Sequence, residues 1–348
     1  MIIKTKAYPR AALIGNPSDG YFGKTIAFTF SNFQTDVTLY PSEEIRILPT
    51  RRDRTAFEGI DDFSRDVSRY GYYGGTRVIK AAIARFLRYC GEKGIRPRGG
   101  NFTIRCHTSI PTHLGLAGSS SIITAVFRAL MRFYGVEIPR RELPGLVLRA
   151  ETEELGIGGG LQDRVAQCYE GMTYMDFDEA LVTGRGYGKY LPMHPAVMPN
   201  LYLAYSASNA ETSDILHNDL RYRFDNGDAA VRNAMTEFAA LTEKVKAMFD
   251  AGNFADLPDA MNANYNLRSS ICAISRRNAA LVAAARSAGA SAKFTGSGGA
   301  VIGTYTDDSA LEALKRAMAA IGAEVIVPEI AWPCGEDDNG ECKEGSTE

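Results

Sequence analysis

Hydrophobic and polar positions alternate along the first half of the chain in short stretches that are separated by two longer helical patterns. Period-two alternation predicts strands, and apolar residues three or four apart predict amphipathic helices. The strand patterns lie at residues 2–15, 25–42 (strands around a turn), 43–49 (an edge strand), 101–111 and 171–177, and the helical patterns at 76–94 and 141–155. We therefore expect an N-terminal region that mixes strands and helices.

The second half continues this mixture. Strand patterns at 201–207, 299–305 and 324–330 accompany helical patterns at 228–251, 254–272, 276–288 and 307–321. Residues 178–200 are rich in Gly, Pro and Tyr, and such composition marks a connection. We predict a domain boundary there, with domains at 1–180 and 181–333. The acidic segment 334–348 has few hydrophobic residues and is predicted to be a disordered tail.

The composition is that of a globular enzyme. Of the 348 residues, 45% are hydrophobic and 23% are charged, and the net charge of −2 disfavours nucleic-acid and membrane-surface binding. No apolar run approaches the roughly 18 residues that span a bilayer, and the first residues lack a secretory pattern. The six cysteines form no CxxC pair, which indicates reduced thiols. We expect a cytoplasmic protein with no nucleic-acid or membrane partner; the sequence leaves its oligomeric state open.

The segment PTHLGLAGSSSIITAVFRAL at 111–130 carries the clearest chemical signal. It is a glycine- and serine-rich loop that runs directly into an amphipathic helix. The first turn of a helix has unpaired N–H donors and the positive end of the helix dipole, so it suits a phosphate group. A serine hydroxyl can cap the helix or face a hard cation. On its own, the string is equally consistent with an ordinary helix cap.

Three further segments accompany this loop. In AYPRAALIGNPSDGYFGKT (7–25), a strand bearing Arg10 gives way to a polar turn. In RAETEELGIGGGLQDRVAQCYEG (149–171), a helix with Glu151 meets a glycine-rich bend, after which Asp163 opens another helix. AKFTGSGGAVIG (292–303) is a glycine turn before an apolar strand. Each segment alone is also typical of turns and caps.

Together, the four segments have the order and spacing of the GHMP superfamily of small-molecule kinases. The loop PTHLGLAGSSS resembles the phosphate motif Pro-x-x-x-Gly-Leu-Gly-Ser-Ser-Ala, with Ala117 as an extra residue and Ser121 in place of alanine. AKFTGSGGA resembles the third motif of the superfamily. GNPSDGYFGKT, GYYGGTR, GLQDRVAQ and KFTGSGGAV are similar to strings of the glucuronokinases, whereas Asn16 and Pro17 replace the Glu-His of galactokinases.

The resemblance covers about residues 7–303 and implies a two-domain α+β fold with the active site in the interdomain cleft. It implies transfer of the γ-phosphoryl group of ATP to the anomeric hydroxyl of D-glucuronate, with Mg²⁺. Two alternatives remain open at this stage. One is a kinase for another sugar or uronic acid, such as galacturonate or an aldohexose, and the other is a non-catalytic sugar or ATP sensor on the same fold.

The resemblance also assigns roles to individual residues. Asp163 would accept the proton of the sugar hydroxyl or orient it, and Arg10 would lie near Asp163 or the γ-phosphate. Ser120 and Glu151 would bind Mg²⁺. The triphosphate would lie over the loop, and two tyrosines would stack on adenine or sugar unless they belong to the core. These nucleotide-side residues are Gly115, Leu116, Ala117, Gly118, Ser119, Ser120, Ser121, Tyr72 and Tyr73.

On the sugar side, Asp19 is similar to a hydroxyl-binding aspartate of galactokinases. A uronic acid also requires a cation or several N–H donors for its carboxylate, and arginine offers the best geometry. The candidates for this carboxylate are Lys24, Arg77 and Arg268, which the sequence does not rank. Gly296, Ser297 and Gly298 of the third motif would close the site beside the transferred phosphate.

Overall fold

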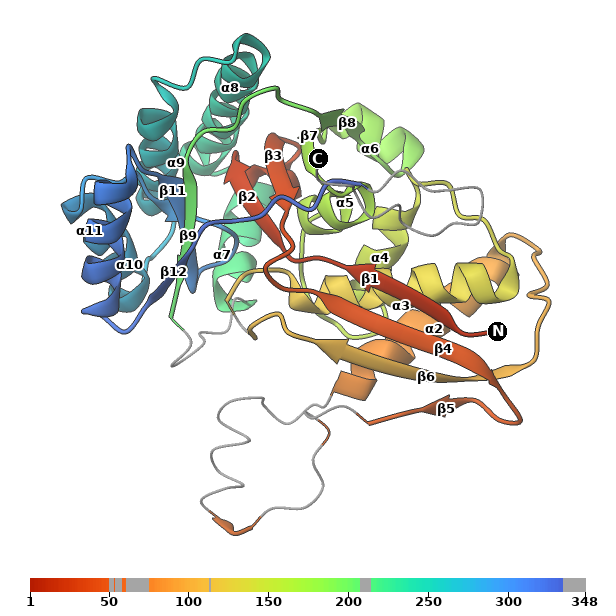
Figure 1. The fold of residues 1–348 in the computed structure, drawn as a ribbon. Coiled ribbons are helices and arrows are strands. Elements are labelled where there is room, and N and C mark those ends of the chain that lie inside the picture. Colours follow the sequence, from red (N-terminus) through yellow and green to blue (C-terminus); the bar gives the residue numbers. More distant parts are fainter. Residues whose placement is uncertain (50–52, 54–57, 61–74, 113, 207–213, 334–348) are drawn as a thin grey trace.

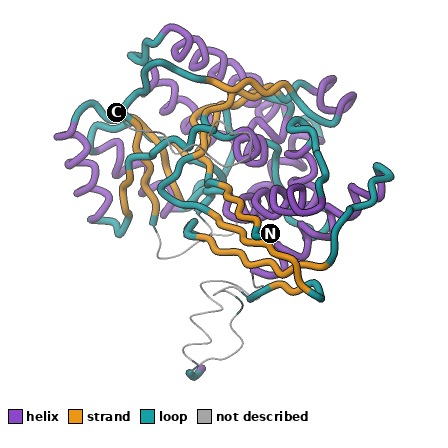
Figure 2. The backbone as a smooth tube through the Cα atoms, turned by 45° about the vertical axis from the view of Figure 1, so that its right-hand side comes forward, coloured by secondary structure: helices purple, strands orange, loops and turns teal. Residues whose placement is uncertain are grey.

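The structure, a computed structural model, describes residues 1–49, 53, 58–60, 75–112, 114–206 and 214–333. Its strands form three four-stranded sheets, with orders β1-β4-β6-β5, β2-β3-β7-β8 and β10-β11-β9-β12. Figure 1 shows the first sheet at one end of the molecule, the third at the other, and the second between them. The turned view of Figure 2 keeps this arrangement of sheets and surrounding helices.

The first sheet carries helices on one face. Its strands are β1 (Ile3–Ala7), β4 (Thr35–Ser42), β5 (Arg46–Ile47) and β6 (Asn101–Thr108). The helices beside it are α2 (Gly75–Glu92), α3 (Gly118–Tyr134) and α4 (Leu143–Thr152). Val37 and Ile104 of the sheet join Phe86 of α2 and Phe127 of α3 in one buried cluster. This packing fixes the start of α3, because β6 leads through residues 109–117 directly into that helix.

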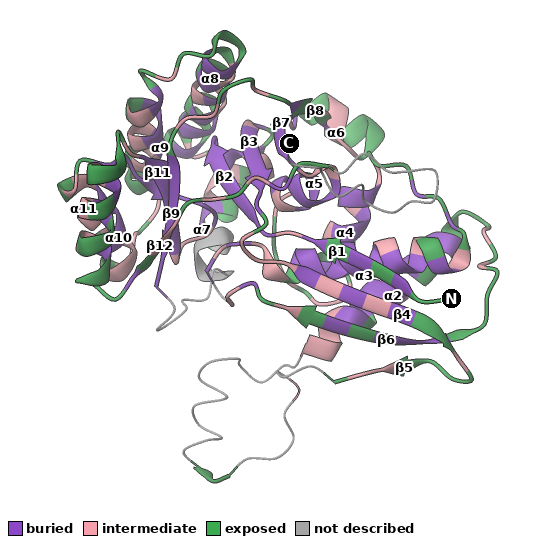
Figure 3. Cartoon of the chain, in the orientation of Figure 1, coloured by how far each residue is buried: buried purple, intermediate pink, exposed green. Residues whose placement is uncertain are grey.

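Three strands of the central sheet are buried on both faces, and its fourth strand is largely exposed. Its strands are β2 (Arg10–Ile14), β3 (Lys24–Thr29), β7 (Met172–Asp176) and β8 (Lys189–Met193). Ala27 packs in a cluster with Val165 of α5 (Gln162–Tyr169), whereas Ile26 and Phe28 pack with Val245 of α8 (Ala229–Ala251). Adjacent strand residues point to opposite faces, so α5 and α8 cover the two sides. Figure 3 accordingly shows β2 and β3 coloured as buried.

The third sheet forms the other end of the molecule. Its strands are β9 (Leu201–Tyr205), β10 (Lys293–Phe294), β11 (Ala300–Thr304) and β12 (Glu324–Ile326). The helices of this part are α7 (Asp214–Asp225), α9 (Leu257–Ile271), α10 (Arg276–Ser287) and α11 (Asp308–Ala319).

After β12, the chain returns to the central sheet. Ile330 forms a β-bridge with Phe30, and the N–H of Ala331 donates to the carbonyl of Thr29 over 2.9 Å. Residues 327–333, which we call the C-terminal strap, thus tie the last part of the described chain to the central sheet. None of the helices in the described residues is both long and apolar enough to cross a membrane.

Most predicted elements are confirmed, but the single strand predicted at 2–15 is wrong. The run 2–15 breaks between β1 and β2, where Pro9 has no N–H to continue a ladder. The strands predicted around a turn at 25–42 are confirmed as β3 and β4, which join different sheets.

Beyond the predicted boundary at residue 180, the chain forms α6 (Glu179–Arg185) and then β8, which pairs with β7. The domain limits 1–180 and 181–333 stay a prediction, and the predicted tail 334–348 lies outside the described residues. The sequence pattern did not predict α7 or the short 3₁₀ helix η1 (Ser18–Tyr21).

Candidate active site

The glycine- and serine-rich segment 111–121, which we call the phosphate loop, leads from β6 into the first turn of α3. It leaves the start of the helix open. Ala117 precedes α3 with a left-handed backbone (φ 62°), and no side chain caps the first turn. Ser119 is exposed, and Ser120 Oγ donates to the carbonyl of Ala117 over 3.2 Å. The first-turn N–H groups therefore face a cavity of about 700 Å³, which the loop lines from Leu114 to Ser120. This geometry suits an anionic ligand.

The loop before α3 interlocks with the third glycine-rich segment. A Cβ atom at Gly115, whose φ is +63°, would lie 2.7 Å from the carbonyl oxygen of Gly298. A Cβ atom at Gly296 would lie 2.4 Å from the carbonyl oxygen of Gly115. Glycine is required at these two positions because the two backbones approach too closely for a side chain.

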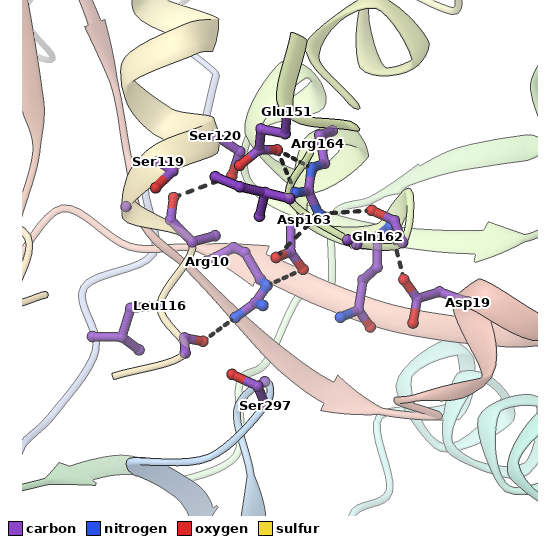
Figure 4. A pocket seen from close by; sticks show the side chains of 18 of the residues that line it. Arg10, Asp19, Leu116, Ser119, Ser120, Glu151, Gln162, Asp163, Arg164 and Ser297 are labelled. Atoms are coloured by element: carbon purple, nitrogen blue, oxygen red, sulfur yellow. Dashed lines mark hydrogen bonds and ion pairs between the residues drawn. The ribbon is translucent and has the colours of Figure 1, made fainter. Parts of the chain in front are cut away.

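Asp163 and Arg10 form the central ion pair of the cavity. Asp163 lies in the first turn of α5, and Arg10 begins β2. Arg10 Nε donates to Asp163 Oδ1 over 2.6 Å, and Arg10 Nη1 also donates to the carbonyls of Gly115 (2.5 Å) and Thr295 (3.1 Å). One buried guanidinium therefore joins the carboxylate to both glycine-rich loops, as Figure 4 shows for Asp163 and the phosphate loop.

The charge state of Asp163 follows from these partners. Burial alone would raise the pKa of its carboxyl, but the charges of Arg10 and Arg164 outweigh burial and lower the pKa below its ordinary value. Asp163 is thus ionised near neutral pH. It can orient a hydroxyl group or receive its proton during transfer.

A second buried ion pair lies behind the first. Glu151 of α4 is 2% exposed, and Arg164 Nε donates to its Oε2 over 2.7 Å. Arg164 Nη2 donates to the same oxygen, and Nη1 lies 3.5 Å from Asp163 Oδ2. Burial raises the pKa of Glu151, and the charge of Arg164 opposes that change. Arg164 therefore touches both carboxylates.

The oxygen atoms of Ser120 and Glu151 fit a hard cation. Both residues line the cavity, and the described hydrogen bonds to the Glu151 carboxylate end on Oε2. That leaves Glu151 Oε1 and the Ser120 hydroxyl as oxygen donors on the side of the phosphate loop (Figure 4). Mg²⁺ retains several waters, so a pair of protein oxygens is an adequate set.

Asp19 forms the far wall, together with the 3₁₀ helix η1. Its Oδ2 accepts the backbone N–H of Gln162 over 3.3 Å, and a Cβ atom at Gly160 would lie only 2.0 Å from that oxygen. Burial and then the negative charge of Asp163 raise the pKa of Asp19 to about 6. At neutral pH, Asp19 is an acceptor beside the reactive pair.

The structure brings most of the predicted residues to this one cavity. The predicted residues that line it are Arg10, Asp19, Arg77, Gly115, Leu116, Ala117, Gly118, Ser119, Ser120, Glu151, Asp163, Arg268, Gly296 and Ser297. Arg77 Nη2 donates to the carbonyl of Leu155 over 3.0 Å. Arg268 is 2% exposed, and its terminal nitrogens donate to the carbonyls of Gly296 (2.6 Å) and Ser297 (2.9 Å).

Other predicted residues lie away from the cavity lining. Lys24 Nζ pairs with Glu243 over 2.5 Å and does not line the cavity, so its role as a substrate ligand stays a prediction without support from this geometry. Ser121 is fully buried, and its hydroxyl group lies 2.7 Å from Thr35 Oγ1. Gly298 contacts the phosphate loop from behind. Tyr72 and Tyr73 lie outside the described residues.

Sequence reasoning missed Arg164 and Arg221, which also line the cavity. Arg164 directly follows Asp163, and a cation beside an expected catalytic carboxylate was an available signal. Arg221 lies on α7, and the sequence offered no signal for it because this helix was not predicted.

Comparisons with known proteins identify the family and the fold. The family described as "GHMP kinases N terminal domain" matches residues 77–171, and the family described as "GHMP kinases C terminal" matches residues 231–324. Probable glucuronokinase 2 and glucuronokinase 1, both from Arabidopsis thaliana, are 39% and 38% identical to the chain; each alignment covers 86% of this chain and 84% of the relative. The structure of Lactococcus lactis galactokinase complexed with galactose superposes with a TM-score of 0.73 at 15% identity, covering 95% of this chain and 94% of that one.

The fold, the uncapped start of α3 and the ionised Asp163 in one cavity are those of a phosphotransferase. The chain belongs to the GHMP kinase family and is an ATP-dependent sugar kinase. The predicted GHMP fold is confirmed.

Proposed function

We propose that this kinase transfers the γ-phosphoryl group of ATP to the anomeric hydroxyl of D-glucuronate, producing ADP and glucuronate 1-phosphate. The observation that carries the proposal is the Arg10–Asp163 pair, which lies between the phosphate loop and Asp19 in one cavity. The similarity to glucuronokinases supports the choice of glucuronate.

In the proposed mechanism, the triphosphate binds to the backbone N–H groups between Gly115 and Ser120. Arg10 holds Asp163 in the ionised form and fixes its orientation through three described hydrogen bonds. Asp163 positions the sugar hydroxyl for in-line attack and takes its proton as the new P–O bond forms. Phosphoryl transfer depends mainly on positioning and charge stabilisation, so a strong base is not required.

Ser120 and Glu151 would hold Mg²⁺, which would neutralise charge on the terminal phosphates. Asp19 would accept hydrogen bonds from sugar hydroxyls at the opposite wall. A cytoplasmic location and the lack of nucleic-acid or membrane partners remain predictions from the composition.

The test is ADP release from ATP and Mg²⁺ with glucuronate, galacturonate, glucose and galactose in parallel, with the phosphate position read by ³¹P NMR. We expect turnover of glucuronate to the 1-phosphate. Turnover of another substrate alone would refute the choice of sugar, and nucleotide and sugar binding without ADP release would favour a sensor.

Asp163→Asn separates catalysis from binding, since it keeps the shape and removes the charge. We expect kcat to fall by about 10²- to 10⁴-fold, with nucleotide affinity nearly unchanged by calorimetry. A kcat equal to that of the parent would refute the role of Asp163.

A further inference from the structure

The arginines that line the described part of the cavity are Arg10, Arg77, Arg164, Arg221 and Arg268, and they differ in exposure and in partners. Arg77 is half-buried, and its Nη2 donates to the carbonyl of Leu155. Arg10 is paired with Asp163, and Arg164 with Glu151. Arg268 is buried, and its terminal nitrogens hold two carbonyls of the third glycine-rich segment. Arg221, by contrast, has a side chain that is 46% exposed.

Arg221 is held in place by the packing of α7 against η1. Leu220 of α7 shares a buried cluster with Tyr21 of η1, and the ring of Phe224 lies 5.0 Å from the ring of Tyr21. The guanidinium of Arg221 lies over the Tyr21 ring at 4.4 Å, and Nη2 donates to the carbonyl of Gly20. The cation is therefore fixed at the wall that also carries Asp19.

The charge of Arg221 is only weakly compensated. Its described carboxylate neighbour is Asp225, whose Oδ1 lies 3.7 Å from Nη1 and whose side chain is 58% exposed. An exposed pair of this kind, four residues apart on a helix, contributes little and is easily rearranged. The guanidinium thus retains donors for a second carboxylate.

The chemistry of a uronic acid requires such a partner on this wall. The reacting hydroxyl must lie at Asp163, and Asp19 accepts hydroxyl donors but repels a carboxylate. A substrate carboxylate is therefore expected beside Arg221, which is held against η1 at Gly20 and Tyr21, rather than beside Asp19 itself.

We propose that Arg221 binds the carboxylate of the sugar substrate and makes the kinase selective for uronic acids. This inference rests on the proposed function and replaces Lys24, which pairs with Glu243 outside the cavity lining. The pair formed with substrate consists of the guanidinium donors and the carboxylate oxygens, and no covalent step is involved.

The test compares D-glucuronate with D-glucuronamide, which has nearly the same shape but no charge, as substrates of the parent and of Arg221→Gln. We expect kcat/KM for glucuronate to fall by about 10- to 100-fold, mainly through KM, as for loss of a charge-assisted hydrogen bond. The value for glucuronamide is expected to change less than about threefold by the same reasoning. Arg221→Lys keeps the charge and should recover part of the loss.

Arg316→Gln on α11 is the matched control, because it removes the same charge from an exposed position that does not line the cavity. It should leave both substrates unaffected. Equal losses for glucuronate and glucuronamide in Arg221→Gln would indicate a structural role and overturn the inference, as would no loss for either.

The outcomes also separate this inference from the proposed function. If the parent phosphorylates galacturonate instead of glucuronate, the choice of sugar fails while the same comparison with galacturonamide still tests Arg221. If the parent uses only neutral sugars, both proposals fail.

Discussion

The buried pair of Arg164 and Glu151 allows a quantitative test by Arg164→Met. Methionine nearly fills the space of the arginine stem but leaves Glu151, which is 2% exposed, without its charge partner. Removing one member of a buried ion pair typically costs about 3–5 kcal/mol, because the remaining charge stays desolvated. Part of the loss is avoided if Glu151 takes up a proton.

That protonation gives the effect a definite pH dependence. Without Arg164, burial acts on Glu151 unopposed, so the pKa of Glu151 in the folded variant rises further above its ordinary value. The folded variant then binds a proton that the unfolded chain has released. Its free energy of unfolding is therefore expected to decrease between pH 5 and pH 8 relative to the parent.

The assay is urea unfolding followed by circular dichroism at several pH values. Arg164→Met/Glu151→Met removes both charges and should recover most of the lost stability. Arg316→Met, at an exposed position, should change stability by no more than about 0.5 kcal/mol. A loss below about 1 kcal/mol for Arg164→Met, or a loss that does not grow with pH, would refute the reasoning.

Three further predictions concern the cavity itself. Burial and the charge of Asp163 raise the pKa of Asp19 to about 6, so Asp19 takes up a proton and becomes a weaker acceptor as the pH falls from 7.5 to 5.5. The KM for glucuronate should therefore rise over this fall in pH, and Asp19→Asn should flatten the profile in steady-state kinetics. Gly115→Ala would place a Cβ atom 2.7 Å from the carbonyl of Gly298, so we expect a stability loss of at least about 1–2 kcal/mol from the left-handed backbone alone and weaker nucleotide binding by calorimetry. Lys24→Met should leave the KM for glucuronate within about twofold of the parent, because exposed pairs contribute little; a tenfold rise would return Lys24 to the site.

Local motifs predicted the chemical centre of the site well. Glycine loops, Asp163, Glu151 and Arg10 stand in strings whose order is recognisable, and the structure places them in one cavity. The strand patterns also predicted most elements. They could not show that residues 2–15 serve two sheets, because both halves have similar alternation and only tertiary pairing distinguishes them.

The long-range contacts were beyond sequence reasoning. A lysine beside the NPSDG turn suggested a substrate ligand, but Glu243 on α8 attracts Lys24 away from the cavity. Arg221 contacts η1 across 201 residues of sequence, and no local pattern encodes that approach. The position of each of these charged side chains depends on the partner that it contacts, and the partners belong to elements distant in the chain.

The central sheet has a consequence for synthesis on the ribosome. Arg10 is made among the first residues, yet its hydrogen bond to the Thr295 carbonyl spans 285 residues. One face of β2 and β3 is covered by α8, which is synthesised much later than these strands. The C-terminal strap contacts the central sheet only at the end of the described chain. Domains generally fold as they emerge, N-terminal part first, but here the emerging first part lacks one cover of its own sheet. Arg10 is thus translated early and positioned late, and a nascent chain that stops before Thr295 lacks one of the contacts that hold Arg10 beside Asp163.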